Sequence, residues 1–379
     1  MLLLNFNLMK VLNISLDKKL LTADSQVRQR VLGYARLFAR FDLIVLSGRG
    51  YQARTEESMV IYPTNSGSRL FYLLDAYILG KKIIKKYQSD IISSQDPFET
   101  GLLAWLLARK YGLKFQVQIH GDYFGSPYWQ AEKLSNKLRY YLGRFVISRA
   151  DGLRVVSDRV KVSLIALGLP AGKIMVVPIY SELKVGGQNG EHGGVSDKFV
   201  FLAVGRLARV KNIKLQIEAM REVIKSQSGQ NVELWIVGDG PEERKLKQKV
   251  KAYGLSASVK FLGWQDDLSQ FYHQADAFLL ISNYEGWGLA VIEAASYGLP
   301  IIMTDVGCAG EIIKNGQSGL VISVGDKRAL AESMIKLLQD KELRTRLGRG
   351  AREAVLGLPS QEENWQLYKD SLVKSLSKI

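Results

Sequence analysis

Short runs of β-branched and aliphatic residues alternate with longer helical patterns along nearly the whole chain of 379 residues. Such alternation is typical of βαβ units, in which crossover helices join parallel strands. In the first half the predicted strands are 10–14, 43–46, 90–93, 115–119, 152–156 and 173–177, with helical periodicity in 27–39 and 69–86. The second half repeats the pattern with predicted strands 199–204, 232–237, 259–262, 277–281 and 300–303. The sequence therefore predicts an α/β protein built on open parallel sheets.

The rhythm breaks at 178–198, PIYSELKVGGQNGEHGGVSDK, which is rich in glycine and polar residues, as interdomain linkers are. The chain is also longer than one ordinary hydrophobic core serves, because domains run about 100 to 200 residues. We therefore predict an N-terminal Rossmann-like domain over 1–190 and a second, facing Rossmann-like domain over 191–360. Residues 361–379 form a predicted terminal helix with enough apolar surface to pack back, towards the N-terminal domain.

The segment 282–311, SNYEGWGLAVIEAASYGLPIIMTDVGCAGE, combines several features of a ligand site. It follows a predicted strand, and ligands of open α/β sheets bind beyond the carboxyl ends of the strands. Gly286 and Gly288 allow backbone N–H groups to approach a phosphate closely, and the helix that follows adds its positive end. Glu285 precedes that helix and Glu293 lies in its early turns, so both carboxylates can accept hydrogen bonds from sugar or ribose hydroxyls.

A pair of glutamates at this spacing also fits a capping acid followed by an exposed helix charge. The segment is not isolated, however, and it resembles the E-x7-E signature of retaining glycosyltransferases of family 4, which have the GT-B fold. Gly205-Arg206-Leu207 with Lys211-Asn212 resembles the G-R-L-x-x-x-K motif of that family. The turns Gly238-Asp239-Gly240-Pro241 and Phe261-Leu262-Gly263 stand where the family places such turns. Several motifs in the same order are more specific than any one of them.

The resemblance implies transfer of a sugar, with retention, from a nucleotide diphosphate sugar to a glycan or lipid-linked acceptor in cell-surface polysaccharide or glycolipid synthesis. It implies that Arg206 and Lys211 clamp the diphosphate, that Glu285 binds the hydroxyls of the donor sugar and that Glu293 binds the ribose. Fixed cations of this kind stabilise the negative charge of a departing diphosphate. The implied donor-binding positions are Gly205, Gly238, Gly286, Gly288, Leu289 and Ala290, beside Glu293.

The match in the first half is looser and includes Gln118-Ile119-His120-Gly121-Asp122 at the end of a predicted strand. A lone histidine is more often structural, but the end of a parallel strand is where ligands bind. The family places a histidine here near the donor sugar and the leaving phosphate, which implies a catalytic role for His120. Asp122 would then orient His120 or touch the acceptor.

Two segments depart from the family pattern. The G-G-x-x-E loop is Gly307-Cys308-Ala309-Gly310-Glu311, with a cysteine at the second glycine, and the Gly-Gly loop after the first strand is replaced by LTADS at 21–25. The chain also contains no D-x-D triplet, and its three histidines and one cysteine lie far apart. We therefore expect neither a cofactor nor a metal.

One motif points to a different ligand. Residues 48–53, GRGYQA, fit the dinucleotide fingerprint G-x-G-x-x-A, which requires a helix to follow. Instead, 57–62 has the pattern of a strand and Pro63 ends it. The sequence therefore argues against an NAD site there.

Positive charge is concentrated in the first half. Residues 1–180 contain 26 lysines and arginines against 13 aspartates and glutamates, a net charge of +13 out of +15 for the chain. Such a surface is either solvated without a partner or attracts phosphates of lipid or nucleic acid. Because nucleic-acid motifs are missing, we expect peripheral association with an anionic membrane and no nucleic acid. The basic stretch 133–149 is either a crossover helix that buries its apolar residues or a membrane-surface helix; those residues are Leu134, Leu138, Tyr141, Leu142 and Phe145.

The sequence predicts a cytoplasmic location, with access to the cytoplasmic face of the membrane. The first residues, MLLLNFNLMK, have no early positive charge and no small-residue cleavage site, unlike a signal peptide. The best apolar run, 101–108, is far shorter than the roughly 20 residues that a bilayer requires. The single cysteine, Cys308, excludes an internal disulfide framework and fits a reducing compartment.

Two other functions remain compatible with the sequence. A related GT-B enzyme such as a nucleotide-sugar epimerase would consume donor without any acceptor. A catalytically silent sugar-nucleotide or membrane-binding protein is the other alternative, and the intact set of Arg206, Lys211, Glu285 and Glu293 argues against it.

Overall fold

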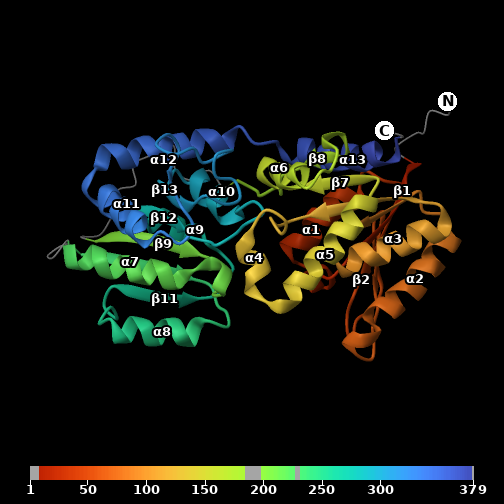
Figure 1. Cartoon of the computed structure of the whole chain (residues 1–379), viewed down its shortest axis with the longest axis horizontal. Coiled ribbons are helices and arrows are strands. Elements are labelled where there is room, and N and C mark those ends of the chain that lie inside the picture. Colours follow the sequence, from red (N-terminus) through yellow and green to blue (C-terminus); the bar gives the residue numbers. More distant parts are fainter. Residues whose placement is uncertain (1–7, 184–197, 227–230, 378–379) are drawn as a thin grey trace. The chain divides into compact units, whose positions relative to one another are not determined.

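The chain folds into two compact α/β units. The computed structural model describes residues 8–183, 198–226 and 231–377. Unit 1 comprises Met1–Tyr180 and Pro359–Ile379, and unit 2 comprises Ser181–Leu358. Each unit has its own mainly parallel sheet (Figure 1). Buried apolar side chains form a separate core in each unit. This is the predicted fold class, with two Rossmann-like units.

Unit 1 is built on an eight-stranded sheet. Its strands are β1 (Lys10–Ser15), β2 (Arg40–Val45), β3 (Arg54–Glu56), β4 (Met59–Pro63), β5 (Ile91–Ser94), β6 (Lys114–Ile119), β7 (Gly152–Val155) and β8 (Ile174–Val176). Their order in space is β3-β4-β2-β1-β5-β6-β7-β8, and all neighbours are parallel except β3 and β4. The chain first adds strands on one side of β1 and then returns to its other side with β5. The carboxyl ends of β1 and β5 therefore form the topological switch point, where ligands of such sheets bind.

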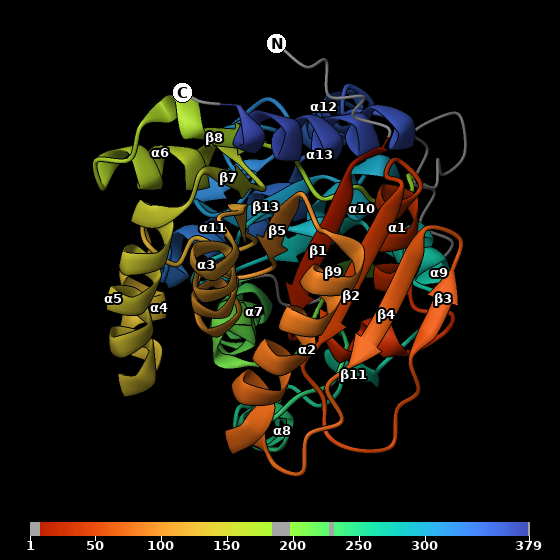
Figure 2. The ribbon, with the colours of Figure 1, turned by 90° about the vertical axis from the view of Figure 1, so that its right-hand side faces the viewer.

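Helices cover both faces of this sheet. They are η2 (Lys18–Leu21), α1 (Gln26–Ala35), η3 (Arg69–Phe71), α2 (Tyr72–Tyr87), α3 (Glu99–Tyr111), α4 (Pro127–Glu132), α5 (Leu134–Arg149), α6 (Asp158–Ala166), η4 (Ala171–Lys173) and α13 (Gln361–Leu376). One apolar cluster joins the sheet to α2, α3 and α5, and a second joins it to α1 and α13 (Figure 2). The strands are apolar on both sides because both sides are buried.

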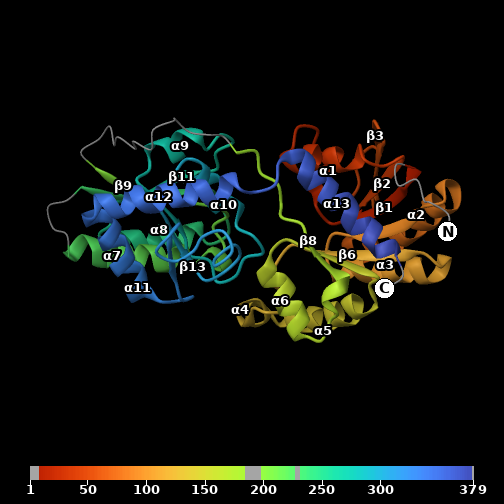
Figure 3. The same ribbon diagram turned by 90° about the horizontal axis from the view of Figure 1, so that it is seen from above.

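Helix α13 belongs to unit 1 although it follows unit 2 in the sequence (Figure 3). A capping box between Ser360 and Glu363 starts the helix. The ring of Tyr368 stacks on that of Tyr34 in α1, with 4.2 Å between centroids. The indole of Trp365 lies where a side chain at Gly33 would stand, so only glycine fits there. The helix predicted at 361–379 thus completes the second core of unit 1.

Unit 2 has a six-stranded, wholly parallel sheet in the order β11-β10-β9-β12-β13-β14. The strands are β9 (Phe199–Val204), β10 (Val232–Val237), β11 (Val259–Gly263), β12 (Ala277–Leu280), β13 (Ile301–Thr304) and β14 (Leu320–Ile322). The helical segments are η5 (Arg209–Lys211), α7 (Ile213–Ser226), α8 (Glu243–Ala252), α9 (Ser269–Gln274), α10 (Leu289–Ser296), α11 (Lys327–Gln339) and α12 (Lys341–Leu356). Here β9 and β12 are the adjacent strands at which the order reverses, so their carboxyl ends form the switch point of unit 2.

The predicted strands agree with the structure to within about three residues at each end. The dinucleotide motif at 48–53 requires a helix to follow it, and the sequence predicts a strand there instead. The structure has that strand as β4. Strands β3 and β14 were not predicted, because three residues are too few to show alternation. Most of the predicted linker, including the boundary at residue 190, lies outside the described residues.

Of the two alternatives for 133–149, a crossover helix that buries its apolar residues is wrong for three of the five named residues. Leu134, Leu138 and Tyr141 are 83%, 76% and 69% exposed, whereas Leu142 and Phe145 pack against the core. Helix α5 faces the core with Gly143, Val146 and Ile147, which leaves the other three on its outer side. In the described ranges, no helix combines the length and apolar character that a membrane span needs.

Candidate functional site

Glycines lie in the loops that follow the carboxyl ends of β9 and β10 in unit 2. Gly205, Gly238 and Gly240 have φ values of 149°, 128° and 155°. A Cβ atom at Gly238 would lie 2.2 Å from the carbonyl oxygen of Gly205, and one at Gly240 would lie 2.5 Å from that of Leu207. These two positions therefore require glycine, because the backbones of the two loops touch directly.

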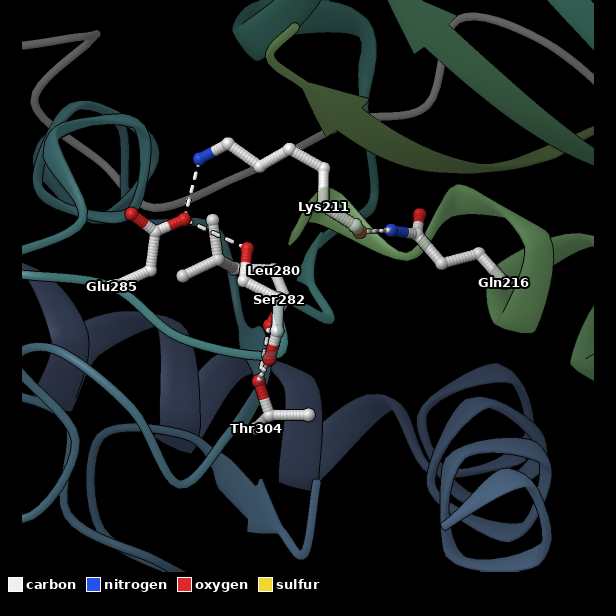
Figure 4. A network of polar contacts seen from close by, with 6 residues as sticks. All are labelled: Lys211, Gln216, Leu280, Ser282, Glu285 and Thr304. Carbon is white, nitrogen blue, oxygen red and sulfur yellow. Dashed lines mark hydrogen bonds and ion pairs between the residues drawn. The ribbon is translucent and has the colours of Figure 1, made fainter. Parts of the chain in front are cut away.

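Lys211 lies over the first of these glycines. The Lys211 Nζ is 2.5 Å from Oε1 of Glu285, and the side chains are 23% and 16% exposed (Figure 4). The Cε of Lys211 lies 3.3 Å from the place of a Cβ at Gly205, so the side chain runs along the end of β9. The fold thus brings a predicted phosphate-binding cation and a predicted sugar-binding carboxylate together from positions 74 residues apart.

Glu285 is held in place by the end of β12 and by β13. The Ser282 hydroxyl donates a hydrogen bond of 2.7 Å to Oε1 of Glu285, the oxygen that also contacts Lys211. The Thr304 hydroxyl in turn donates to the carbonyl oxygen of Ser282 at 2.6 Å (Figure 4). This chain of contacts fixes the carboxylate at the switch point, as an oriented binding group requires.

Arg206 lies next to Gly205 and is exposed. In the described parts of the chain it makes no ion pair with an acidic side chain. An exposed guanidinium with free donors can bind the oxygen atoms of a phosphate in pairs.

Helix α10 begins at the same edge of the sheet. Gly288, with a φ of 101°, precedes the first helical residue, and Gly286 is buried in the loop before it. The first N–H groups of a helix have no partner within the helix, and they carry its partial positive charge. Leu289 and Ala290 are half-buried at this end, so their N–H groups suit a phosphate oxygen.

Glu293 occupies a separate network one turn further along α10. The Tyr272 hydroxyl donates to its Oε2 at 3.0 Å, and the Ser181 hydroxyl donates to its Oε1 at 3.3 Å. Burial, and then the neighbouring Glu293 carboxylate, raise the pKa of Tyr272 well above its ordinary value, so this phenol remains a donor. The two glutamates therefore have different partners, which permits different roles.

The loop at 307–311 explains the departure from the G-G-x-x-E pattern. Gly307 has a φ of 56°, and a Cβ there would lie 2.5 Å from the carbonyl oxygen of Trp287. The Cys308 side chain is buried, and its N–H donates to the same carbonyl at 2.9 Å. The first position thus requires glycine, whereas the second turns its side chain into the core and tolerates cysteine.

His120 follows β6 in unit 1 and lines a cavity of about 440 Å³. Burial, followed by the positive charges of Arg154 and Arg30, lowers the pKa of His120 to about 3. The imidazole is therefore neutral at physiological pH, so one ring nitrogen donates a hydrogen bond and the other accepts one.

The Asp122 carboxylate forms hydrogen bonds with its own loop and with α6, and not with His120, among the described residues. Its Oδ1 accepts hydrogen bonds from the Gly125 N–H at 2.9 Å and from the Ser163 hydroxyl at 3.0 Å. The described residues include no hydrogen bond between Asp122 and His120. Burial raises the pKa of the Asp122 carboxyl. In the structure this side chain holds its own loop against α6.

Sequence reasoning missed four polar residues beside His120. Asn13, Asp96, Arg30 and Arg154 line the same cavity. Asp96 lies just after a predicted strand, where ligands of parallel sheets bind, so its position could have marked it as a site residue. Arg154 is a charged residue within an otherwise apolar predicted strand, which could have marked it as a buried charge. Arg30 lies on the amphipathic helix α1, where a cation is ordinary.

A metal site has no support from side-chain clustering. Over residues 8–183, 198–226 and 231–377, no three histidine, cysteine, aspartate or glutamate residues are grouped so that they could hold an ion. The cationic and backbone donors of unit 2 are instead the groups available to a diphosphate.

Comparisons with known proteins cover most of the chain. The family model described as Glycosyl transferases group 1 matches residues 188–354, and that described as Glycosyl transferase 4-like domain matches residues 23–179. N-acetyl-alpha-D-glucosaminyl L-malate synthase of Bacillus anthracis is 33% identical over 44% of this chain and 42% of its own length, so the chain matches less than half of that relative.

Two further similarities extend over more of the chain. UDP-Gal:alpha-D-GlcNAc-diphosphoundecaprenol alpha-1,3-galactosyltransferase of Escherichia coli is 29% identical over 69% of this chain and 70% of its own length. Sucrose-phosphate synthase of Thermosynechococcus elongatus has a solved structure that superposes with a TM-score of 0.81 at 23% identity, covering 96% of this chain and 99% of the other. The two family models, the fold and the order of the motifs agree, and the chain belongs to the group 1 glycosyl transferases with the GT-B fold.

Proposed function

We propose that the protein transfers a sugar from a nucleoside diphosphate sugar to an acceptor hydroxyl, with retention of the anomeric configuration. The observation that carries this proposal is the placement of Lys211 and Glu285 against each other at the switch point of unit 2. A cation and a carboxylate at this edge match the two ends of the bond to be broken, the phosphate and the sugar. Glu293, with its separate partners, is the candidate ligand of the ribose.

The proposed donor is a nucleoside diphosphate sugar that is bound mainly by unit 2. Arg206, Lys211 and the start of α10 would bind the phosphate oxygens, and these are positive groups that stabilise charge as it develops on the leaving group. The Escherichia coli relative is named for UDP-Gal as its donor, which supports a donor of this class for the present chain.

The proposed chemical step is attack on the same face of the sugar that the diphosphate leaves. The bond between the anomeric carbon and the phosphate oxygen breaks, the acceptor oxygen bonds to that carbon, and the acceptor proton passes to the departing phosphate. A covalent route needs a free carboxylate in unit 1, but Asp122 and Asp96 both accept hydrogen bonds from their own loops. A glycosyl-enzyme trapped in a mass spectrum would contradict this step.

The reaction is proposed to need no divalent metal, because cationic side chains are available for the diphosphate and the sequence has no D-x-D triplet. We expect activity to survive dialysis against a chelator. A strict requirement for added magnesium or manganese would refute this part of the proposal.

The acceptor is proposed to be a glycan or a lipid-linked sugar, in the synthesis of cell-surface polysaccharide or glycolipid at the cytoplasmic face of a membrane. The Escherichia coli relative is named for a lipid diphosphate acceptor. In this chain, Leu134, Leu138 and Tyr141 form an outward apolar stripe on α5, which contains no acidic residue. Lys133, Lys137 and Arg144 are exposed around the stripe, as in a helix that lies on an anionic bilayer.

A thermal-stability screen of nucleoside diphosphates tests the proposed class of donor. A ligand at 100 times its dissociation constant stabilises a protein by about 2.7 kcal/mol, so UDP or GDP should raise the melting temperature while the nucleoside does not. Turnover with the matching donor sugars then follows. No stabilisation by any nucleoside diphosphate would reject the donor class.

The acceptor requirement separates transfer from epimerisation. In a purified system without acceptor, an epimerase would consume the donor. A transferase would at most hydrolyse the donor slowly under the same conditions. A silent binding protein would be stabilised by nucleoside diphosphate yet release none from any donor sugar.

A further inference from the structure

The cavity in unit 1 contains a buried positive charge that no carboxylate neutralises. Arg154 is only 3% exposed. Its Nη1 donates to Oε1 of Gln118 at 2.7 Å and its Nη2 to the carbonyl oxygen of Val177 at 3.3 Å, while its Nε has no partner. The described residues include no ion pair of Arg154 with an acidic side chain. Burying an unpaired charge is costly, so this arrangement calls for a counter-charge.

A second arginine faces the same space. Arg30 of α1 lines the cavity and, within the described ranges, also has no ion pair. Burial and, to a lesser extent, the charge of Arg154 lower the pKa of the Arg30 guanidinium, although nearby Tyr34 and Asp17 act in the opposite direction. Two guanidinium groups thus act on each other across the cavity.

The acidic residues of the cavity wall are directed elsewhere. Oδ1 of Asp17 accepts a hydrogen bond from the Lys19 N–H at 2.9 Å. Asp96 accepts from the Phe98 N–H and from the Thr100 hydroxyl, both at 2.7 Å. Asp17 caps η2 and Asp96 holds the loop before α3, and neither carboxylate forms a salt bridge with Arg30 or Arg154 among the described residues.

The neutral groups of the wall leave hydrogen-bonding capacity unused. Asn13 is 1% exposed and lines the cavity, and apart from a contact with the Tyr368 hydroxyl neither its Nδ2 nor its Oδ1 has a hydrogen-bond partner among the described residues. Buried polar groups without partners are rare in native proteins, and they often mark the place of a ligand or water. The neutral ring of His120 opens onto the same space.

We propose that this cavity binds an anionic group of the acceptor, a carboxylate or a phosphate, with Arg30 and Arg154 as its counter-charges. The guanidinium group matches the geometry of both anions, and the cavity of about 440 Å³ is large enough for a small acceptor or the head of a larger one. The inference rests on the proposed transfer function, since it assigns the class of the acceptor.

A purely structural role accounts for only part of the arrangement. The bonds of Arg154 to Gln118 and Val177, and its place 5.1 Å from the ring of Tyr368, tie β7 to neighbouring elements. They give no reason for a second unpaired cation at Arg30. The donor diphosphate is the competing ligand, and the experiment must separate it from the acceptor.

The test uses the full chain saturated with the nucleoside diphosphate that stabilises it, so that the diphosphate site is filled. Inorganic phosphate and L-malate are titrated by calorimetry, with glycerol as the neutral probe. We expect both anions to bind in the millimolar range and glycerol not to bind. Arg30→Gln should weaken anion binding at least tenfold, and Arg154→Lys, which keeps the charge but loses the planar fork, should weaken it less.

The control variant is Lys18→Gln, which removes one exposed charge from neighbouring η2 and should leave anion binding unchanged. Equal anion affinity in Arg30→Gln and wild type, or no anion binding, would overturn the proposal. A matching loss of nucleoside diphosphate affinity in Arg30→Gln would assign the arginines to the donor instead. If no nucleoside diphosphate binds, the proposed function fails, and the same titration without nucleotide still decides whether the anion site exists.

Discussion

The switch points of the two units differ in whether their charged side chains are paired. In unit 2 the ammonium of Lys211 and the carboxylate of Glu285 neutralise each other without ligand, at a rim made of glycine backbone. In unit 1 Arg30 and Arg154 form no ion pair among the described residues, and burial keeps the His120 ring neutral. A charge pair at one edge and unpaired cations at the other imply that ligand binding exchanges partners in unit 2, whereas in unit 1 it supplies a missing partner.

The largest effect is expected where unit 2 contacts the leaving group. Replacing both Arg206 and Lys211 by alanine should lower turnover by on the order of 10²-fold or more, the scale seen when a donor to a transition-state charge is lost. Steady-state turnover and a thermal melt of the same sample measure activity and folding. The matched control is Lys214→Ala, which removes an exposed cation of α7. Near-wild-type turnover in the double variant would remove the basis for the diphosphate clamp.

The two glutamates of unit 2 should divide affinity from rate. Glu293 is assigned to the ribose, which does not change during transfer, so Glu293→Gln should weaken donor and free nucleoside diphosphate alike, by about tenfold. Glu285 is assigned to the sugar whose charge changes, so Glu285→Gln should slow single turnover by about tenfold or more with a smaller change in nucleotide affinity. The reverse pattern would mean that the donor lies in the opposite direction along α10.

The outer face of unit 1 should bind anionic membranes. Each basic residue near such a surface contributes about 1 kcal/mol, so the protein should sediment with acidic vesicles, less so at high salt, and not with neutral vesicles. Changing Leu134, Leu138 and Tyr141 to serine should reduce this binding about tenfold, since each large apolar side chain contributes roughly 1.5–3 kcal/mol when fully buried and these insert only partly. Val162→Ser, an exposed apolar residue of α6, is the control. Equal binding of the triple variant would assign the charge of unit 1 to another role.

The smallest effect concerns the pH dependence of stability. The pKa of His120 is about 3 in the fold, compared with about 6.5 in an unfolded chain. Between these values the unfolded chain takes up a proton that the fold excludes, so stability is complete above pH 6.5 and falls as the pH is lowered towards 3. His120→Gln should therefore lose less stability than wild type between about pH 7 and pH 5 in denaturant titrations. Parallel curves would show that the imidazole is not held neutral.

Residues required by the backbone could be predicted from the sequence, and so could the order of the elements. Gly238 and Gly240 leave no room for a side chain, and the apolar strands before them mark where the loops begin. These requirements are local, so a motif along the chain reveals them. The pairing of Lys211 with Glu285 is not local, but both residues follow strands that a parallel sheet brings together.

The missed features depend on contacts that no local pattern encodes. Arg154 lies within a strand, and only the packing of α1 and α13 around it shows that its charge lacks a partner. The outward stripe of α5 was ambiguous for a similar reason. Its apolar residues occupy two sides of the helix. Which side meets the core depends on how closely Gly101 of α3 approaches Val146, and on the rings of Phe98 and Phe124 at Gly143.

Helix α13 also affects the order in which the protein can fold during synthesis. Most of unit 1 precedes unit 2 in the sequence, yet Tyr368 and Leu372 of its core are translated only after all of unit 2. Unit 2 is continuous in sequence and can close its core first, because domains generally fold as units on the ribosome. Until residue 376 has left the ribosome, the face of unit 1 that receives α13 stays open. Until then, the cavity that Arg30 and Arg154 line also lacks Tyr368 from its wall. Completion of this cavity therefore has to wait until α13 has been synthesised.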